Sequence, residues 1–440
     1  MSNTNSNNVT RHTLDNGMIV LLKEVHSAPI ISWWVRYRIG SRNERTGQTG
    51  ISHWVEHMMF KGTPDFPASM LDRAIDREGG SWNAHTGPDH TAYFEVMPAD
   101  RIDLALRLEA DRMVNALFEA EEVASERTVI ISERQGMENQ PMFWLGEELQ
   151  AAAFRVHGYH HEIIGDMADL LTMTRDDLYG HYQNYYAPNN AIAIAVGDFD
   201  SDEMLARINE LYGAIPAADT PELFVRAEPE QMGERRVTVE RPGNTPFLQV
   251  GFRIPDATHD DWFTLNVMDA VLNGASGPGG SVGNKTSRLY KALVETEVAA
   301  SVDGGVSATL DPYLYAITVT VRDGHTLEEA EAALNAELDR IRDEDITEAE
   351  LNKAKKQSRA LFAYGNERVS SQAYWLGFAE HIGDHQWMEH YMERIEAATV
   401  ADVRAVAERY LRSQNRVTGW LVPTGMGEGD DMEGYEDGDE

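Results

Sequence analysis

The order of predicted elements in the second half of this chain faintly repeats the order in the first half. In the first half, an alternating strand at 30–38 precedes a short apolar helix, a strand pair and two long amphipathic helices. In the second half, LQVGFRIP (248–255) resembles that strand, and two strands and two long helices follow within 287–357. A repeat of this kind predicts an α+β fold of two homologous domains, each about half of the 440 residues.

The joint between the two domains is expected in the Pro- and Glu-rich stretch 216–234. We therefore predict domains at 1–220 and 221–425. The last fifteen residues, 426–440, contain eight acids and four glycines, a composition typical of a disordered tail.

The short apolar helix of the first half carries His53, Glu56 and His57 in the pentad His-Trp-Val-Glu-His. Histidines four residues apart project from one face of a helix, and Glu56 shares that face. Two imidazoles that hold zinc, with a carboxylate that takes a proton from metal-bound water, form the core of a hydrolytic zinc site. The order reverses the thermolysin-type pentad and is the inverzincin arrangement. The corresponding segment of the second half, 261–274, lacks it.

Two histidines satisfied within a protein core are the alternative interpretation of this pentad. Its neighbours favour the metal, because apolar residues surround the three polar ones and indicate a largely buried helix. Buried ionisable groups need partners, and a metal ion is one.

A third ligand is predicted on the helix at 119–137, where Glu126 and Glu133 lie seven residues apart. Seven residues make nearly two turns, so both carboxylates point the same way. One could bind the ion while the other orients a ligand. A solvated acidic face is the alternative.

Four blocks of the sequence, in order, resemble the pitrilysin/insulinase family of zinc peptidases. The resemblance covers nearly the whole chain. The blocks are GISHWVEHMMFKGT (50–63), GGSWNAHTGPDHTAYFEV (79–96), SERTVIISE (125–133) and YYAPNNAIAIAVGDFD (185–200).

This resemblance implies that His53, His57 and Glu133 bind Zn²⁺, that Glu56 is the general base, and that Glu126 is a supporting acid. It also implies antiparallel sheets flanked by helices, with the two halves facing each other across a cavity. The expected activity is a zinc endopeptidase acting on peptides or unfolded polypeptides.

The resemblance further implies that the strand within GGSWNAHTG pairs with an extended substrate by edge addition, with Asn83 and Ala84 near the scissile bond. The alternative for Asn83 is a side-chain amide that bonds its own backbone.

Catalytic members of the family usually carry an arginine, and seven residues later a tyrosine, that stabilise the oxyanion. Here these positions are Val294 and Ser301, which cannot donate in the same way. We therefore expect the chain to be the zinc subunit of a heterodimer whose homologous partner supplies the pair. A non-catalytic peptide-binding or scaffold subunit, and a self-sufficient homodimeric peptidase, are the alternatives.

The formal charge of −35 argues against direct binding of nucleic acid. This acidity suits a saline environment or solubility, and the alternative is attraction of basic peptides. There are no cysteines, no apolar signal core at the N-terminus and no run as long as a membrane span, so we expect a cytoplasmic protein.

Two further motifs are not assigned chemistry. The glycine-rich stretch 273–285 lacks the Gly-Lys-Ser/Thr ending of a phosphate loop, and is either a substrate-contacting loop like that of presequence-processing relatives or a plain connection. His157, His160 and His161 lie in a block that the resemblance assigns to a loop without ligands.

Overall fold

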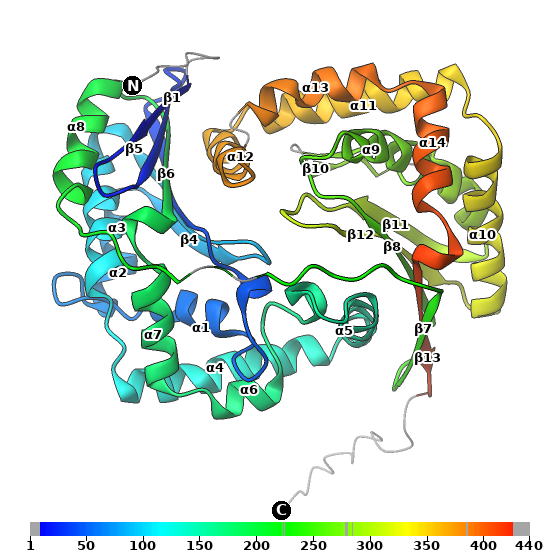
Figure 1. The fold of residues 1–440 in the computed structure, drawn as a ribbon, viewed down its shortest axis with the longest axis horizontal. Coiled ribbons are helices and arrows are strands. Elements are labelled where there is room, and N and C mark those ends of the chain that lie inside the picture. Colours follow the sequence, from blue (N-terminus) through cyan, green and yellow to red (C-terminus); the bar gives the residue numbers. More distant parts are fainter. Residues whose placement is uncertain are drawn as a thin grey trace, which may run out of the picture.

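The computed structural model describes residues 9–221, 223, 225–277, 280–283, 285–383 and 386–425. Two sheet-bearing halves face each other, each with helices packed on its sheet (Figure 1). The predicted α+β class is confirmed. The predicted acidic tail, 426–440, lies outside the described residues, and the division at residue 220 stays a prediction.

The first half is built on a six-stranded sheet in the order β1-β2-β6-β3-β5-β4. Its central strand β6 reads AIAIAVG, and all seven residues are buried, as expected for a strand covered on both faces. The strands are β1 (Val9–Thr13), β2 (Ile19–Glu24), β3 (Ile30–Tyr37), β4 (Ser81–Thr86), β5 (Thr91–Pro98) and β6 (Ala191–Gly197). The helices are α1 (Ile51–Met58), α2 (Ala68–Arg77), α3 (Ile102–Asn115), α4 (Ala120–Glu138), α5 (Pro141–Ala153), α6 (Met167–Thr172), α7 (Arg175–Tyr185) and α8 (Ser201–Tyr212).

The second half is built on a five-stranded sheet in the order β11-β12-β8-β13-β7. The glycine-rich stretch contributes a separate pair of two-residue strands, β9 (Ser276–Gly277) and β10 (Gly280–Ser281). The strands of the main sheet are β7 (Arg235–Arg241), β8 (Phe247–Ile254), β11 (Ala299–Val306), β12 (Tyr313–Val321) and β13 (Arg416–Pro423). The helices are α9 (Asp260–Leu272), α10 (Leu327–Asp343), α11 (Glu348–Gly365), α12 (Val369–His381), α13 (Trp387–Ala397) and α14 (Val400–Tyr410).

The two sheets have the same topology once β1 is set aside. The order β2-β6-β3-β5-β4 corresponds to β7-β13-β8-β12-β11. Each sheet departs from the predicted antiparallel arrangement in one place, because β2 pairs with β6, and β7 with β13, in parallel. The physical reason is the connection: each late strand returns to the sheet only after a long helical excursion, which permits a parallel crossover.

Each half also lends one helix to the sheet of the other (Figure 1). Helix α12 packs on β3 and β6 of the first sheet, where it encloses Ile192 and Ile194. Helix α5 packs on β7, β8 and β13 of the second sheet, where Leu149 meets Val417. The halves are therefore joined by shared apolar cores as well as by the chain.

No helix among the described residues is long and apolar enough to cross a bilayer.

Candidate metal centre

Helix α1 presents two imidazoles on the same side. The helix starts after Gly50, whose φ of 85° is the left-handed conformation that glycine adopts without strain. Ile51, Trp54, Val55 and Met58 are buried in the core of the first half and fix the rotation of the helix. His53 and His57, four residues apart, then lie side by side with ring centroids 4.6 Å apart.

Helix α4 brings Glu133 to the two imidazoles. Oε2 of Glu133 lies 3.9 Å from Nε2 of His53 and 3.6 Å from Nε2 of His57. Two ligand atoms at about 2.0–2.2 Å from a tetrahedral ion lie roughly 3.3–3.6 Å apart, so these separations are close to those that zinc requires. Within the described residues, this trio is the one set of three such side chains that could hold an ion.

Glu126 orients His57. Oε1 of Glu126 lies 2.8 Å from Nδ1 of His57, which assigns the imidazole proton to Nδ1 and leaves the lone pair on Nε2, facing Glu133. Burial alone would lower the pKa of His57, but the bond to Glu126 and the nearby carboxylates raise it. Burial also tends to raise the pKa of Glu126, and its contacts with His57 and Lys61 lower it.

His53 is held in the neutral form that a metal requires. Burial, assisted by the charge of His57, lowers its pKa to about 4. The donor set of two neutral imidazole nitrogens and one carboxylate oxygen fits Zn²⁺ and leaves a fourth position open for water or substrate.

Glu56 lies on the same helix, with its side chain largely buried at 8% exposure. Oγ1 of Thr86, on β4, donates a hydrogen bond of 2.5 Å to Oε2 of Glu56. Burial raises the pKa of Glu56, against the lowering effects of the Thr86 bond and of His57. A carboxylate with a raised pKa is better matched to proton exchange near neutrality.

Asn83 and Ala84 lie on β4, the edge strand of the first sheet, which packs beside α1. Oδ1 of Asn83 accepts a hydrogen bond of 2.9 Å from the backbone N–H of Ala84, the local bond that was the alternative for this residue. The substrate roles of both residues stay predictions.

The two positions where the arginine and tyrosine were missing lie in the second half. Val294 ends a short π-helix and packs partly buried against the core, and Ser301 is exposed on β11, bonded to Thr320 at 3.0 Å.

The histidines of the 157–161 cluster have separate partners: His157 lies 3.2 Å from Asp311, His160 bonds the carbonyl of His157, and His161 bonds the carbonyl of Glu162.

Sequence reasoning missed Lys61 and Thr86, which contact the two carboxylates next to the imidazoles. Lys61 lies beyond the end of α1 at Met58, so helical spacing from His57 gave no signal for its contact with Glu126. Thr86 carried no such signal, because its contact with Glu56 depends on how β4 packs on α1.

The chain was compared with known families, proteins and structures. The sequence model described as Insulinase (Peptidase family M16) matches residues 19–167, and the one described as Peptidase M16 inactive domain matches residues 172–358.

The chain is 30% identical to the zinc protease PqqE of Helicobacter pylori, over 93% of this chain and 92% of that protein. It is 26% identical to a probable mitochondrial-processing peptidase subunit beta of Arabidopsis thaliana, over 91% of this chain and 75% of that protein. The crystal structure of a protease from Helicobacter pylori matches with a TM-score of 0.89 at 27% identity, covering 94% of this chain and 99% of the other.

Proposed function

Because this chain belongs to the insulinase family, peptidase family M16, we propose that it is a zinc-dependent endopeptidase acting on peptides or unfolded polypeptides. The observation that carries the proposal is the convergence of His53, His57 and Glu133 from two helices, with Glu56 one residue before His57. The Helicobacter pylori relative is named a zinc protease, which supports the same metal and reaction.

Each residue of the metal centre has a separate proposed role. His53, His57 and Glu133 hold the ion, and Glu126 keeps the His57 tautomer and ring orientation. A bound zinc ion supplies Lewis acidity for the scissile carbonyl and a water acidified to near neutrality. Glu56 would be the residue that accepts a proton from the attacking water and gives it to the leaving amine, and the Thr86 hydrogen bond restrains its carboxylate.

The edge strand β4 offers main-chain hydrogen bonds to an extended peptide. Asn83 and Ala84 lie on this strand beside the helix of the imidazoles, so they are the residues that we propose to contact the substrate near the scissile bond. Backbone pairing gives affinity with little sequence preference, which suits a peptidase for varied or unfolded chains.

A partner subunit is part of the proposal. Val294 and Ser301 occupy positions where an arginine and a tyrosine are expected, and loss of one oxyanion donor costs about a hundredfold or more in turnover. The Arabidopsis thaliana relative is named as a subunit, which supports an assembly of homologous chains.

The base assignment is tested with Glu56→Gln, which retains size and removes the proton acceptor. We expect kcat on a quenched fluorescent peptide to fall by about 10²–10⁴-fold while bound zinc stays at the wild-type level. Glu122→Gln, at an exposed site on α4, is the control and should change neither quantity. Undiminished hydrolysis by Glu56→Gln, or loss of its zinc, would contradict the assignment.

The same assay tests the assembly. The purified chain is assayed alone and with a homologue that lacks the metal pentad but carries the arginine and tyrosine. A gain of about a hundredfold with the homologue supports the heterodimer. Full activity of the chain alone, as a single species in native mass spectrometry, favours the homodimeric alternative, and zinc-loaded protein inactive in every combination favours the scaffold.

A further inference from the structure

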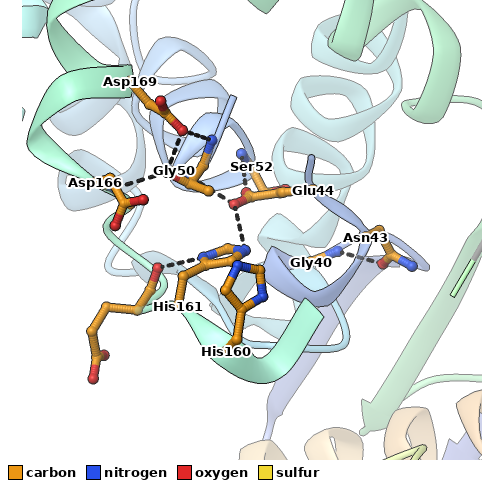
Figure 2. Close-up of polar contacts among 12 residues, drawn as sticks. Gly40, Asn43, Glu44, Gly50, Ser52, His160, His161, Asp166 and Asp169 are labelled. Atoms are coloured by element: carbon orange, nitrogen blue, oxygen red, sulfur yellow. Dashed lines mark hydrogen bonds and ion pairs between the residues drawn. The ribbon is translucent and has the colours of Figure 1, made fainter. Parts of the chain in front are cut away.

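The start of the metal helix α1 is held by a buried carboxylate that the proposed mechanism does not use. The side chain of Glu44 is fully buried, and its two oxygens accept the backbone N–H groups of Gly50 at 2.7 Å and Ser52 at 2.8 Å (Figure 2). These N–H groups lie at the start of the helix, where no preceding helical turn supplies a carbonyl to accept their hydrogen bonds. Glu44 therefore caps the N-terminal end of α1 from outside the helix. One of the two residues that it binds, Ser52, directly precedes His53.

A second carboxylate holds the loop that leads into the same helix. Oδ2 of Asp169 accepts hydrogen bonds from the N–H groups of Gly47 at 3.0 Å and Thr49 at 2.9 Å, and from the Thr49 hydroxyl at 2.7 Å. The Thr49 hydroxyl in turn accepts from the N–H of Asp166 at 2.8 Å. Figure 2 shows Asp166 and Asp169, which belong to segment 161–170, beside Gly50 at the start of α1.

The backbones of the two segments are in close contact. A Cβ atom at Gly50 would lie 2.4 Å from the carbonyl oxygen of Ile164, and one at Gly165 would lie 2.2 Å from that of Thr49. Both glycines have positive φ, 85° and 83°, so no other residue fits either position without strain. The segment thus presses directly on the start of α1.

The same segment is tied to α4, the helix of the third ligand. Nη1 of Arg134, the residue after Glu133, donates a hydrogen bond of 2.6 Å to the carbonyl of Gly165. Arg127, two turns earlier, donates to the carbonyls of Leu170 at 2.8 Å and Met173 at 2.7 Å, and its guanidinium lies over the ring of Trp54 on α1. One segment therefore contacts both helices that carry the metal ligands.

We propose that Glu44 is a positioning residue of the metal centre. It fixes the start of α1 against segment 161–170, which is held on α4 by the bonds from Arg134 to Gly165 and from Arg127 to Leu170. This inference rests on the proposed function. The imidazoles and Glu133 come from separate helices, so their mutual separation depends on what joins those helices. Residues that orient metal ligands from outside the ligand set typically change metal affinity by about 10–100-fold.

The burial of Glu44 supports this role. Removal from water raises the pKa of its carboxyl to about 8, against the lowering effect of the N–H bonds from Ser52 and Gly50. The Ser52 side chain also bonds this carboxyl, and Nε2 of His161 lies 3.8 Å from its Oε2. Burying the Glu44 carboxyl costs free energy, and its hydrogen bonds to the start of α1 offset that cost. Removal of the carboxyl leaves the N–H groups of Gly50 and Ser52 without this acceptor.

The test measures metal binding, not peptide hydrolysis. Zn²⁺ affinity is determined by competition with a chromophoric chelator, and the visible spectrum of the Co²⁺-substituted protein reports ligand geometry. Glu44→Gln presents an NH₂ group to one of the two N–H donors, and Thr49→Val removes one hydroxyl while keeping the shape. Thr172→Val, whose exposed hydroxyl bonds only backbone carbonyls on α6, is the matched control. Ile341→Val, in the core of the second half, controls for loss of stability alone.

We expect Glu44→Gln to weaken zinc binding by about 10–100-fold and to alter the Co²⁺ spectrum, and Thr49→Val to weaken it by at least about fivefold. Thr172→Val and Ile341→Val should stay within about twofold of the wild-type affinity. A folded Glu44→Gln protein with wild-type affinity and spectrum would overturn the proposal. If Glu44→Gln does not fold, Thr49→Val serves as the test. A Thr49→Val protein with wild-type zinc affinity would then overturn the proposal.

The two proposals fail in different ways. A wild-type chain that binds zinc and cleaves no peptide, either alone or with the homologous partner, contradicts the peptidase but not the metal centre. A wild-type chain that binds no zinc contradicts the metal centre itself, before any variant is compared.

Discussion

Helices α1 and α9 occupy equivalent places in the two halves and differ in what they expose. Each packs against the edge-strand side of its sheet and against a long helix, α4 in the first half and α11 in the second. On α1, the imidazoles of His53 and His57 remain partly accessible, at 14% and 23% exposure. From Trp262 to the end of α9, by contrast, all but one residue are buried, mostly apolar side chains in the core of the second half.

The long helices differ in how their acids are neutralised. On α4, Glu126 and Glu133 face imidazoles, which are neutral unless protonated. On α11, Glu350 is bonded at 2.7 and 3.1 Å by the guanidinium of Arg288, a permanent cation. The same architecture thus supports a closed ion pair in one half. In the other half, Glu126 contacts Lys61 and His57, and Glu133 faces two imidazoles.

This comparison separates the requirements of the fold from those of the site. Glu350 on α11 is paired with a guanidinium, whereas Glu133 on α4 faces two imidazoles. The metal centre therefore depends on a few substitutions within a common framework.

The largest effect should come from Glu133→Gln, compared with Glu350→Gln in the second half. Loss of a direct ligand should weaken zinc binding by more than about a hundredfold, above the range for residues that only orient ligands. Glu350→Gln should leave zinc affinity within about twofold. Metal analysis after dialysis checks both, and equal loss of zinc from the two variants would break the contrast between the halves.

A smaller effect is expected for Thr86→Val on β4. The Thr86 bond lowers the pKa of Glu56, so its loss should raise that pKa and move the acidic limb of the pH–rate profile to higher pH. At neutral pH the rate should fall by less than about tenfold. Ser301→Ala, on the matching edge strand β11, should leave the profile unchanged, and an acidic limb shifted to lower pH in Thr86→Val would contradict the assignment.

The smallest effect concerns stability. The Arg288 bond lowers the pKa of Glu350 to about 2 from its ordinary 4.5. The folded-state pKa is depressed, so the pair stabilises the fold above about pH 4.5 and loses this contribution as the pH falls towards 2. Allowing for solvent screening, Glu350→Gln should cost about 1–2 kcal/mol near neutrality. The Tm difference from wild type should narrow on acidification, and a difference that widens would exclude the ion pair as its source.

Much of the framework was predictable from local patterns. The two long helices of the first half, α3 and α4, follow from their apolar periodicity. The parallel strand pairs and the exchange of α5 and α12 were not predicted. Both depend on contacts between residues far apart in the sequence, and no local periodicity records which sheet an apolar helix will cover.

The candidate site shows the same limit. The pentad indicated which faces of α1 carry His53, Glu56 and His57, and the seven-residue spacing put Glu126 and Glu133 on one face of α4. That Glu126 contacts His57 while Glu133 faces both imidazoles emerges only when the two helices pack. Glu44, six residues before Gly50, gave no signal, because its role depends on the path of a loop.

The exchange of α5 and α12 has a consequence for how the molecule holds together. Ile194 on the first sheet and Leu149 on α5 are each buried by residues from the opposite half, so neither half encloses its own interior. Cohesion therefore does not depend on the covalent link through 216–234 alone, although Glu228 in that link also bonds the backbone of 155–157 and pairs with Arg253. Severed there, the polypeptide would behave as two mutually dependent subunits.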